Sequence, residues 1–171
     1  MFVLGIDPGL SRCGYGAVRR SGAELRAVAC GVITTPPEQP LPERLAALAG
    51  ELRALLAELR PDVVAVERVF FQTNVRTAMS VGQASGLALV AAVEAEAGVA
   101  QYTSNEVKQA VVGYGAATKE QVQRMVQSLL GLAERPQPAD AADALALALC
   151  HHAQAPVQAR IEAARVAAAR R

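Results

Sequence analysis

Two short apolar segments of this chain each end in a carboxylate. Residues 2–7 read FVLGID and residues 62–67 read DVVAVE, so Asp7 and Glu67 close runs of aliphatic side chains. Runs this short and this apolar predict strands that are buried on both faces, as in a parallel sheet covered by helices. If the two strands are neighbours, both carboxylates emerge at the same sheet edge, where ligand sites in α/β sheets tend to lie.

The remaining pattern adds three strands and five helices. Two further strands are predicted at 14–20 and 25–34, separated by a polar turn, and one at 99–103. Helices are predicted at 41–60, 75–97, 104–112, 118–130 and 140–152. Three successive strands with tight turns favour an antiparallel half, and the later β-α-β units favour parallel strands beside it. We therefore expect an α/β fold with a mixed five-stranded sheet and helices on both faces.

Length and charge place the chain in a broad class. Its 171 residues suit one domain, and 17 basic residues nearly balance 16 acidic ones. This balance argues against a protein that coats nucleic acid by bulk charge, but it leaves room for a local basic groove. Apolar stretches such as 86–93 are too short to span a membrane, and the N-terminus has no basic leader. Three widely spaced cysteines without a CxxC pair favour a reduced, cytoplasmic setting.

Two more acids, Asp140 and Asp143, open a predicted helix with a spacing that places them on one face. With Asp7 and Glu67 they would offer four oxygen ligands, which suit Mg²⁺ or Mn²⁺. Two ionised carboxylates about 4 Å apart repel by roughly 4 kcal/mol at an effective dielectric near 20. Such a cluster would therefore hold protons or metal. Two cations about 4 Å apart could activate a water and stabilise the departing oxygen of a phosphodiester.

Each acid also has an ordinary structural explanation. Asp7 precedes Pro8-Gly9 and could simply begin a turn, and Glu67 could be a solvated strand end. Asp140 could cap a helix, and Asp143 could interact with the helix dipole. What these explanations leave unexplained is the coincidence of two strands that end in an acid and a helix that opens with two.

Five segments of the sequence occur together in a distinctive order: GIDPGLSRCGYG at 5–16, VERVF at 66–70, VKQAVVG at 107–113, KEQVQRMV at 119–126 and DAADALALA at 140–148. Together they resemble the RuvC-type Holliday junction resolvases, and the likeness extends to about His152. The resemblance implies a ribonuclease-H-like fold and nicking of two opposed strands of a four-way DNA junction in DNA recombination and repair. It further implies two Mg²⁺ or Mn²⁺ ions per site, and nicks with 5′-phosphate and 3′-hydroxyl ends.

The resemblance also assigns residues. The four catalytic and metal-binding acids of the family fall on Asp7, Glu67, Asp140 and Asp143. Its functional lysines fall on Lys108 and Lys119, the two lysines of the chain. An aromatic that stacks on a DNA base in the family corresponds to Phe70, the first residue of a Phe-Phe pair. Together with Arg76 of the following loop, these are the expected DNA-binding residues. Compact lysine cations suit phosphate, and an exposed aromatic suits base stacking. The ordinary alternatives are a solvated helix face for the lysines and a local hydrophobic cluster for the phenylalanines.

The expected partners are a second copy of the chain and, as the resemblance implies, a branch-migration motor of the RuvA and RuvB type. A two-fold dimer would present two equivalent sites to a junction of approximate two-fold symmetry. Gly82 and Gly86 give a small-x-x-x-small spacing that allows close packing, either within the core or against a partner. We expect a nuclease domain over 1–153 and a basic tail over 154–171, onto which the resemblance carries nothing.

Three alternative functions stay open from the sequence. The segment at 5–16 also resembles the phosphate-binding hairpin of actin-type and sugar-kinase-type phosphotransferases, which normally need two such domains. The acids could be structural in a module that only binds branched DNA. A related ribonuclease-H-fold nuclease could instead cut RNA or RNA–DNA hybrids.

Overall fold

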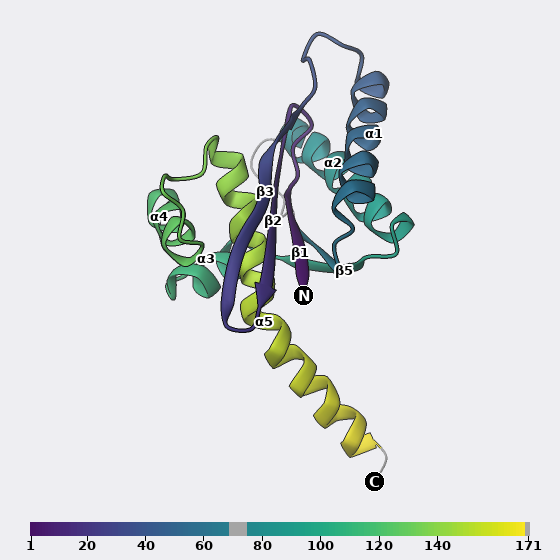
Figure 1. Ribbon diagram of the computed structural model, residues 1–171. Helices are drawn as coiled ribbons and strands as arrows, with labels where there is room; N and C mark the ends of the chain where they lie inside the picture. The colour runs from purple at the N-terminus through teal and green to yellow at the C-terminus, as the bar shows by residue number, and fades with distance from the viewer. Residues whose placement is uncertain (69–74, 170–171) are drawn as a thin grey trace.

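The computed structural model describes residues 1–68 and 75–169, with side chains described except at 75–77, 158–159, 161–164 and 166–169. Three strands come first along the described chain, strands and helices then alternate, and three helices follow, as Figure 1 shows. Their bounds are β1 Phe2–Asp7, β2 Arg12–Ser21, β3 Glu24–Thr34, α1 Leu41–Leu59, β4 Val63–Glu67, α2 Val75–Glu94, β5 Gly98–Tyr102, α3 Ser104–Val112, α4 Lys119–Leu129 and α5 Ala139–Ala169.

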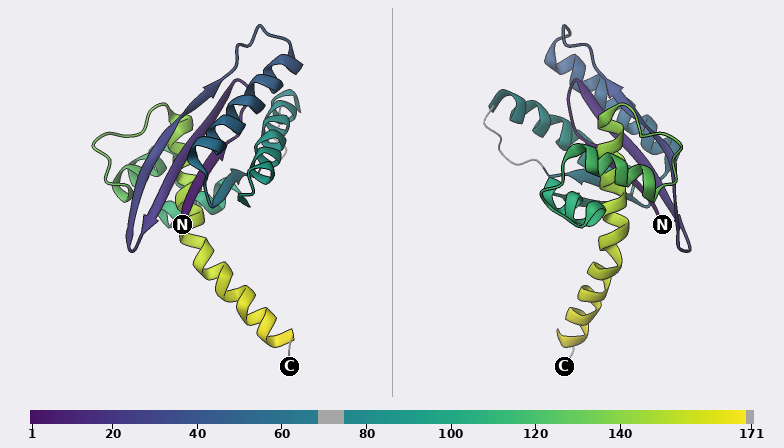
Figure 2. Two further views of the ribbon diagram at one scale, coloured as in Figure 1. Left: turned by 45° about the vertical axis from the view of Figure 1, so that its right-hand side comes forward. Right: turned by 90° about the vertical axis from the view of Figure 1, so that its left-hand side faces the viewer.

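The strands form one mixed sheet with the order β3-β2-β1-β4-β5. β1 pairs antiparallel with β2 and parallel with β4, and β5 extends the parallel half. Helices α1 and α2 cover one face, and α3, α4 and α5 cover the other (Figures 1 and 2). The expected fold class is therefore confirmed: a five-stranded mixed sheet with helices on both faces.

Alternation along the central strands decides which core each side chain enters. Val3 of β1 and Ala65 of β4 belong to the core beneath α5. Their neighbours belong to the opposite core, between the sheet and α1–α2: Phe2, Leu4, Ile6, Val64 and Val66. Counting on by two, Asp7 and Glu67 fall on the α5 side of the sheet, at the carboxyl ends of two adjacent parallel strands.

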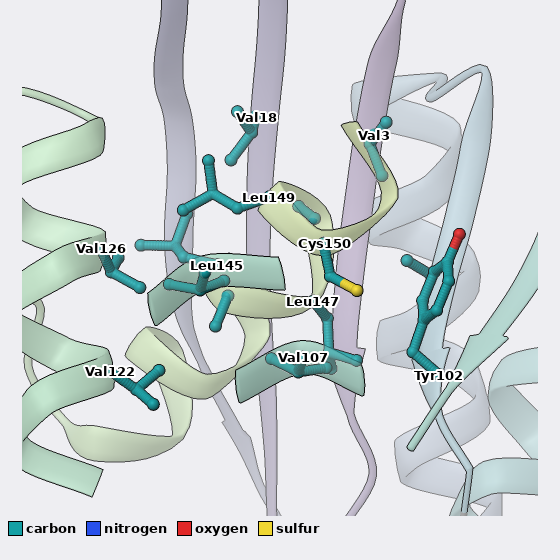
Figure 3. Packing of buried hydrophobic residues seen from close by; sticks show 14 of the residues in the cluster. Val3, Val18, Tyr102, Val107, Val122, Val126, Leu145, Leu147, Leu149 and Cys150 are labelled. Atoms are coloured by element: carbon teal, nitrogen blue, oxygen red, sulfur yellow. The ribbon is translucent and has the colours of Figure 1, made fainter. Parts of the chain in front are cut away.

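Helix α5 lies directly on β1 and β2 because glycines leave room for it. A Cβ added at Gly5 would collide with the carbonyl oxygen of Ala144, and one added at Gly14 would collide with that of Asp140. Further along the helix, Leu145 and Leu149 pack among side chains of the sheet and α4 (Figure 3). This close approach fixes the first turn of α5 over the end of β1.

Two predicted helix ends differ from the structure by more than one residue. The helix predicted at 75–97 ends at Glu94, because Glu96 adopts a left-handed φ of 56°. The helix predicted at 140–152 continues through Pro156 to Ala169, and its last turns project away from the sheet (Figures 1 and 2). The division at residue 153 stays a prediction. Among the described residues, no helix has the length and apolarity to cross a bilayer.

Candidate active site

A cavity of about 240 Å³ opens at the carboxyl ends of β1 and β4. Three acids and both lysines of the chain line it: Asp7, Glu67, Asp143, Lys108 and Lys119. The rest of the lining is mostly apolar and comes from α3, α4 and α5: Ser104, Val107, Val122, Ala146 and Leu147. Five elements far apart in the sequence thus bring carboxylates and ammonium groups to one hollow above an apolar floor.

The sheet register explains how the acids meet. Ile6 pairs with Val66 across the parallel strands, and the next residue on each strand is an acid. On its other side Asp7 pairs with Gly14, and Gly14 lies against the backbone of Asp140. Asp140 is therefore close enough for its charge to act on Asp7. It does not line the cavity itself, so the structure places three of the four predicted acids in the pocket and the fourth at its rim.

Asp7 and Glu67 are partly buried and hydrogen-bonded to each other. Burial, followed by the charges of Glu67, Asp143 and Asp140, raises the pKa of Asp7 from 3.8 to about 7. Burial also raises the pKa of Glu67, although the hydrogen bond from Asp7 and the two lysines oppose the rise. The protonated Asp7 thus donates to the Glu67 carboxylate, and this pair holds its shared proton up to about pH 7.

The two acids of α5 are held by cations instead. Lys119 Nζ lies 2.6 Å from Asp143 Oδ2, and this hydrogen bond raises the pKa of the lysine. Arg12 binds Asp140 through two N–H groups. Burial acts to raise the pKa of Asp140, but the bonds from Arg12 and from the backbone, together with nearby positive charges, bring it below its ordinary value.

The donor set fits a hard divalent cation in its chemistry. Carboxylate oxygens are the ligands that Mg²⁺ and Mn²⁺ prefer. Because the buried pair Asp7 and Glu67 shares a proton, a bound cation could supply the positive charge that lets both acids ionise. In the part of the chain that the structure describes, no three His, Cys, Asp or Glu side chains are arranged to ligate one ion. The carboxylates of Asp140 and Asp143 are instead paired with Arg12 and Lys119.

Two predicted DNA contacts lie outside the described residues. Phe70 belongs to the undescribed segment, and only the backbone of Arg76, in α2, is described.

Arg12 and Ser104 were missed in the sequence. Arg12 is the first residue of β2, the strand that follows Asp7 in sequence and pairs with β1. It stands two residues before Gly14, which pairs with Asp7. Ser104 is the first residue of α3 and directly follows the N-cap residue Thr103. The capping box formed by Thr103 and Glu106 is a sequence signal for this helix start, and it places Ser104 in the first turn.

No second catalytic group competes with the acids among the described side chains of the core. Cys13 and Cys150 are buried, and burial raises their thiol pKa values to about 11 and about 12. Both histidines are buried too: His151 Nδ1 lies 2.7 Å from the Tyr102 hydroxyl and His152 Nε2 lies 3.0 Å from the carbonyl oxygen of Val18. Cys150 belongs to the core beneath α5, where both histidines find their partners, and Cys13 belongs to the opposite core between the sheet and α1–α2.

The sequence model of the crossover junction endodeoxyribonuclease RuvC matches residues 3–151, which include every residue that lines the cavity. The chain belongs to the RuvC family. RuvC-family proteins are endonucleases and depend on metal ions. Membership in this family therefore agrees with a pocket whose carboxylates can bind metal cations.

Known relatives extend over almost the whole chain. The crossover junction endodeoxyribonuclease RuvC of Chloroflexus aggregans is 53% identical over 156 residues, covering 91% of this chain and 95% of that protein. The structure of Thermus thermophilus RuvC in complex with Holliday junction substrate matches with a TM-score of 0.87 and 43% identity, covering 92% and 96%. The yeast mitochondrial Holliday junction resolvase Ydc2 matches with a TM-score of 0.61 at 15% identity, covering 86% and 77%, which supports the fold alone. The ribonuclease-H-like fold is thereby confirmed.

Proposed function

We propose that this chain is a metal-dependent endonuclease that resolves four-way DNA junctions by paired, symmetric nicks in recombination and repair. The observation that carries the proposal is the pocket, in which three carboxylates and two lysines meet at the ends of β1 and β4 of a RuvC-family chain. Its similarity to Thermus thermophilus RuvC, whose structure holds a Holliday junction substrate, supports the choice of DNA. The expected nicks leave 5′-phosphate and 3′-hydroxyl ends.

Asp7, Glu67, Asp140 and Asp143 are the residues we assign to catalysis and metal binding, with Mg²⁺ or Mn²⁺ as the ion and two ions per site. Divalent cations, when bound, lower the pKa of a water and stabilise the charge that develops on a phosphodiester. The raised pKa of Asp7 supports the assignment, because burial first, and then the charges of the neighbouring acids, disfavour its ionised form unless a cation is present. Loss of the shared proton would leave both carboxylates as ligands.

The lysines and the apolar floor have separate tasks. Lys108 and Lys119 line the same cavity as the acids and offer compact cations that can hold a DNA phosphate against it. Lys119 contacts Asp143, so it can also keep that carboxylate oriented. The apolar side chains of Val107 and Val122 line the same pocket, and charge interactions are stronger where bulk water is excluded. Phe70 and Arg76 remain our candidates for contacts to the DNA beside the cut.

A panel of substrates tests the proposed reaction. The purified protein is incubated with Mn²⁺ and a four-way junction, a linear duplex, a single strand or an RNA–DNA hybrid, and the nicked strands are mapped and then treated with ligase. We expect paired nicks in the junction that ligase can seal. Equal cutting of the hybrid would favour a ribonuclease, and tight binding without any nick would favour a binding module. Turnover of ATP would instead favour the phosphotransferase.

A homodimer is the second part of the proposal, and helix α2 supports it. Met79, Val90 and Val93 are more than half exposed, and together with Gly82 and Gly86 they follow helical spacing along one face. A Cβ added at either glycine would meet nothing within this protomer. Glycine in a helix costs about 1 kcal/mol relative to alanine, so two such residues without a packing role in the protomer suggest a close partner.

Substitution of one of these glycines tests the dimer. Gly86→Arg should convert the dimer to a monomer in sedimentation or light-scattering experiments, because the new side chain occupies the partner's place. Gly50→Arg is the matched control, since Gly50 is an exposed glycine of α1 whose Cβ would also meet open space. A wild-type monomer, or a dimer that tolerates Gly86→Arg, would contradict this assignment.

We also propose the cytoplasm as the compartment and a branch-migration motor of the RuvA and RuvB type as a partner.

A further inference from the structure

Arg12 is a cation of this site to which the sequence assigned no role. Its Nε and Nη2 atoms lie 3.1 and 2.8 Å from the same oxygen, Oδ2 of Asp140. The two residues are 128 positions apart in the chain, so the fold brings them together. Two N–H groups that converge on one carboxylate oxygen occupy the lone pairs with which that oxygen would bind a metal ion.

The backbone beneath this pair is fixed, whereas the side chains are accessible. Gly14, two residues after Arg12, packs against the backbone of Asp140 and pairs with Asp7. The Arg12 side chain is 50% exposed and that of Asp140 is 28% exposed. Ion pairs with this much solvent contact are weak and are screened by salt, so a competing ligand can separate them. Arg12 can then turn to solvent without any movement of β2.

We propose that Arg12 is a positioning residue that competes with the divalent cation for Asp140 and binds a DNA phosphate once the cation has displaced it. The inference rests on the proposed function. A divalent cation and a guanidinium exclude each other at one oxygen because both are positive. The displaced guanidinium lies beside the pocket that is proposed to receive a DNA phosphate, and its planar N–H groups match the geometry of a phosphate.

This exchange links two ligands. While Arg12 holds Asp140, the cation binds less tightly than the carboxylates alone would allow. Once DNA offers a phosphate, Arg12 has a second partner and the cation meets less competition. Cation and DNA therefore favour each other's binding, and such coupling is reciprocal.

The first experiment measures cation binding without DNA. Mn²⁺ is titrated into the full-length protein, and free Mn²⁺ is followed by electron paramagnetic resonance. We expect Arg12→Gln to bind Mn²⁺ about two- to fivefold more tightly than the wild type, the range expected for loss of a half-exposed ion pair. Arg53→Gln is the matched control, because Arg53 forms a similar pair with Glu94 away from the pocket. Unchanged or weaker Mn²⁺ binding by Arg12→Gln would overturn the proposal.

The second experiment measures the contact to phosphate. Junction affinity is determined at several salt concentrations in Ca²⁺, which also takes oxygen ligands. Arg12→Gln should weaken binding and lower the slope of log affinity against log salt by about one, as loss of one phosphate contact predicts. Arg12→Lys should restore most of the slope, because it keeps the charge. An unchanged slope in Arg12→Gln would overturn the phosphate contact.

Failure of this inference is distinguishable from failure of the proposed function. If the wild type does not nick junctions, the proposed function is wrong, and the Mn²⁺ titration still decides whether Arg12 competes at Asp140. In an Asp140→Asn background, Arg12→Gln should no longer change Mn²⁺ affinity. A persistent effect there would place the action of Arg12 elsewhere and overturn the proposal. Thermal unfolding of each variant checks that the fold is retained.

Discussion

The acids of the sheet and the acids of helix α5 lie in one neighbourhood but compensate their charge in opposite ways. Asp7 and Glu67 end buried strands, face each other, and share a proton, with the pKa of Asp7 raised to about 7 chiefly by burial. Asp140 and Asp143 lie nearer to solvent, and each is held by a basic side chain. For Asp140 the bonds from Arg12 and the backbone outweigh burial and lower the pKa.

Residue type alone therefore does not fix the protonation state of a carboxylate in this protein. At the sheet, acids brought together by strand register form no ion pair with a described side chain, and desolvation favours the neutral form of Asp7. On the helix, Arg12 and Lys119 reach acids that water also reaches. The sheet acids should therefore respond to removal of a carboxylate, and the helix acids to removal of a cation.

The largest expected effect comes from Asp7→Asn. This change removes a proposed metal ligand, so we expect the rate of junction cleavage to fall by about 10²–10³-fold or more. Junction binding should persist because the lysines remain. Asp62→Asn is the control, since Asp62 is the one Asp of the sequence outside the cluster of acids. It directly precedes β4, at the end of that strand opposite Glu67. Undiminished cleavage by Asp7→Asn would remove Asp7 from the mechanism.

The same substitution should stabilise the fold, which sharpens the contrast with the helix acids. Because the folded-state pKa of Asp7 is raised, ionisation costs stability as pH rises from about 4 to about 7, and no cost applies below that window. Asn cannot ionise, so the free energy of unfolding in EDTA should increase by about 2–4 kcal/mol at pH 8 and change little at pH 4. Urea unfolding at both pH values measures this. Equal effects at the two pH values would contradict the raised pKa.

Removal of a cation tests the other half of the comparison. Lys119→Gln breaks the contact with Asp143 and removes a charge that lowers the pKa of Glu67 and Asp140. We expect cleavage to fall about ten- to a hundredfold, as when a group that orients a metal ligand is lost. Arg124→Gln is the control on the same helix, because Arg124 pairs with Glu120 in a long, exposed contact. A similar loss in both variants would assign the effect to α4 as a whole.

The smallest expected effect is the response to salt. The Arg12 interaction that lowers the pKa of Asp140 is exposed to solvent, so raising NaCl to 1 M should screen it and raise that pKa slightly. The pKa of Asp7 should move less, because desolvation is its largest cause and salt does not reverse burial. Carboxyl-carbon NMR titrations at low and high salt measure both values. A larger shift at Asp7 than at Asp140 would reverse the comparison.

Much of the fold could be read from local patterns. The two acid-terminated strands are found as predicted, with Phe2–Asp7 matching to the residue. The strand predicted from Gly14 begins earlier, at Arg12, because its first residues pair with β3 although they form no apolar run. The last helix could not be delimited, since alanine-rich sequence beyond His152 is compatible with helix or with frayed chain, and Pro156 suggested an end.

The site was predictable only in part. Asp7, Glu67 and Asp143 could be singled out because each stands at the end of a strand or in the first turn of a helix, and the structure gathers them in one pocket. The position of Asp140 at the rim, and its partner Arg12, could not, because a contact across 128 residues leaves no periodic signal in the sequence. The DNA-binding role of Phe70 stays a prediction.

The order of strands and helices and the residue types at their ends follow from the residue pattern, because alternation and helical spacing are local properties of the chain. Tertiary structure decided which acids share a proton and which are held by cations. Those states depend on burial and on neighbours from other elements, and glycines such as Gly14 set them by letting α5 lie against the sheet.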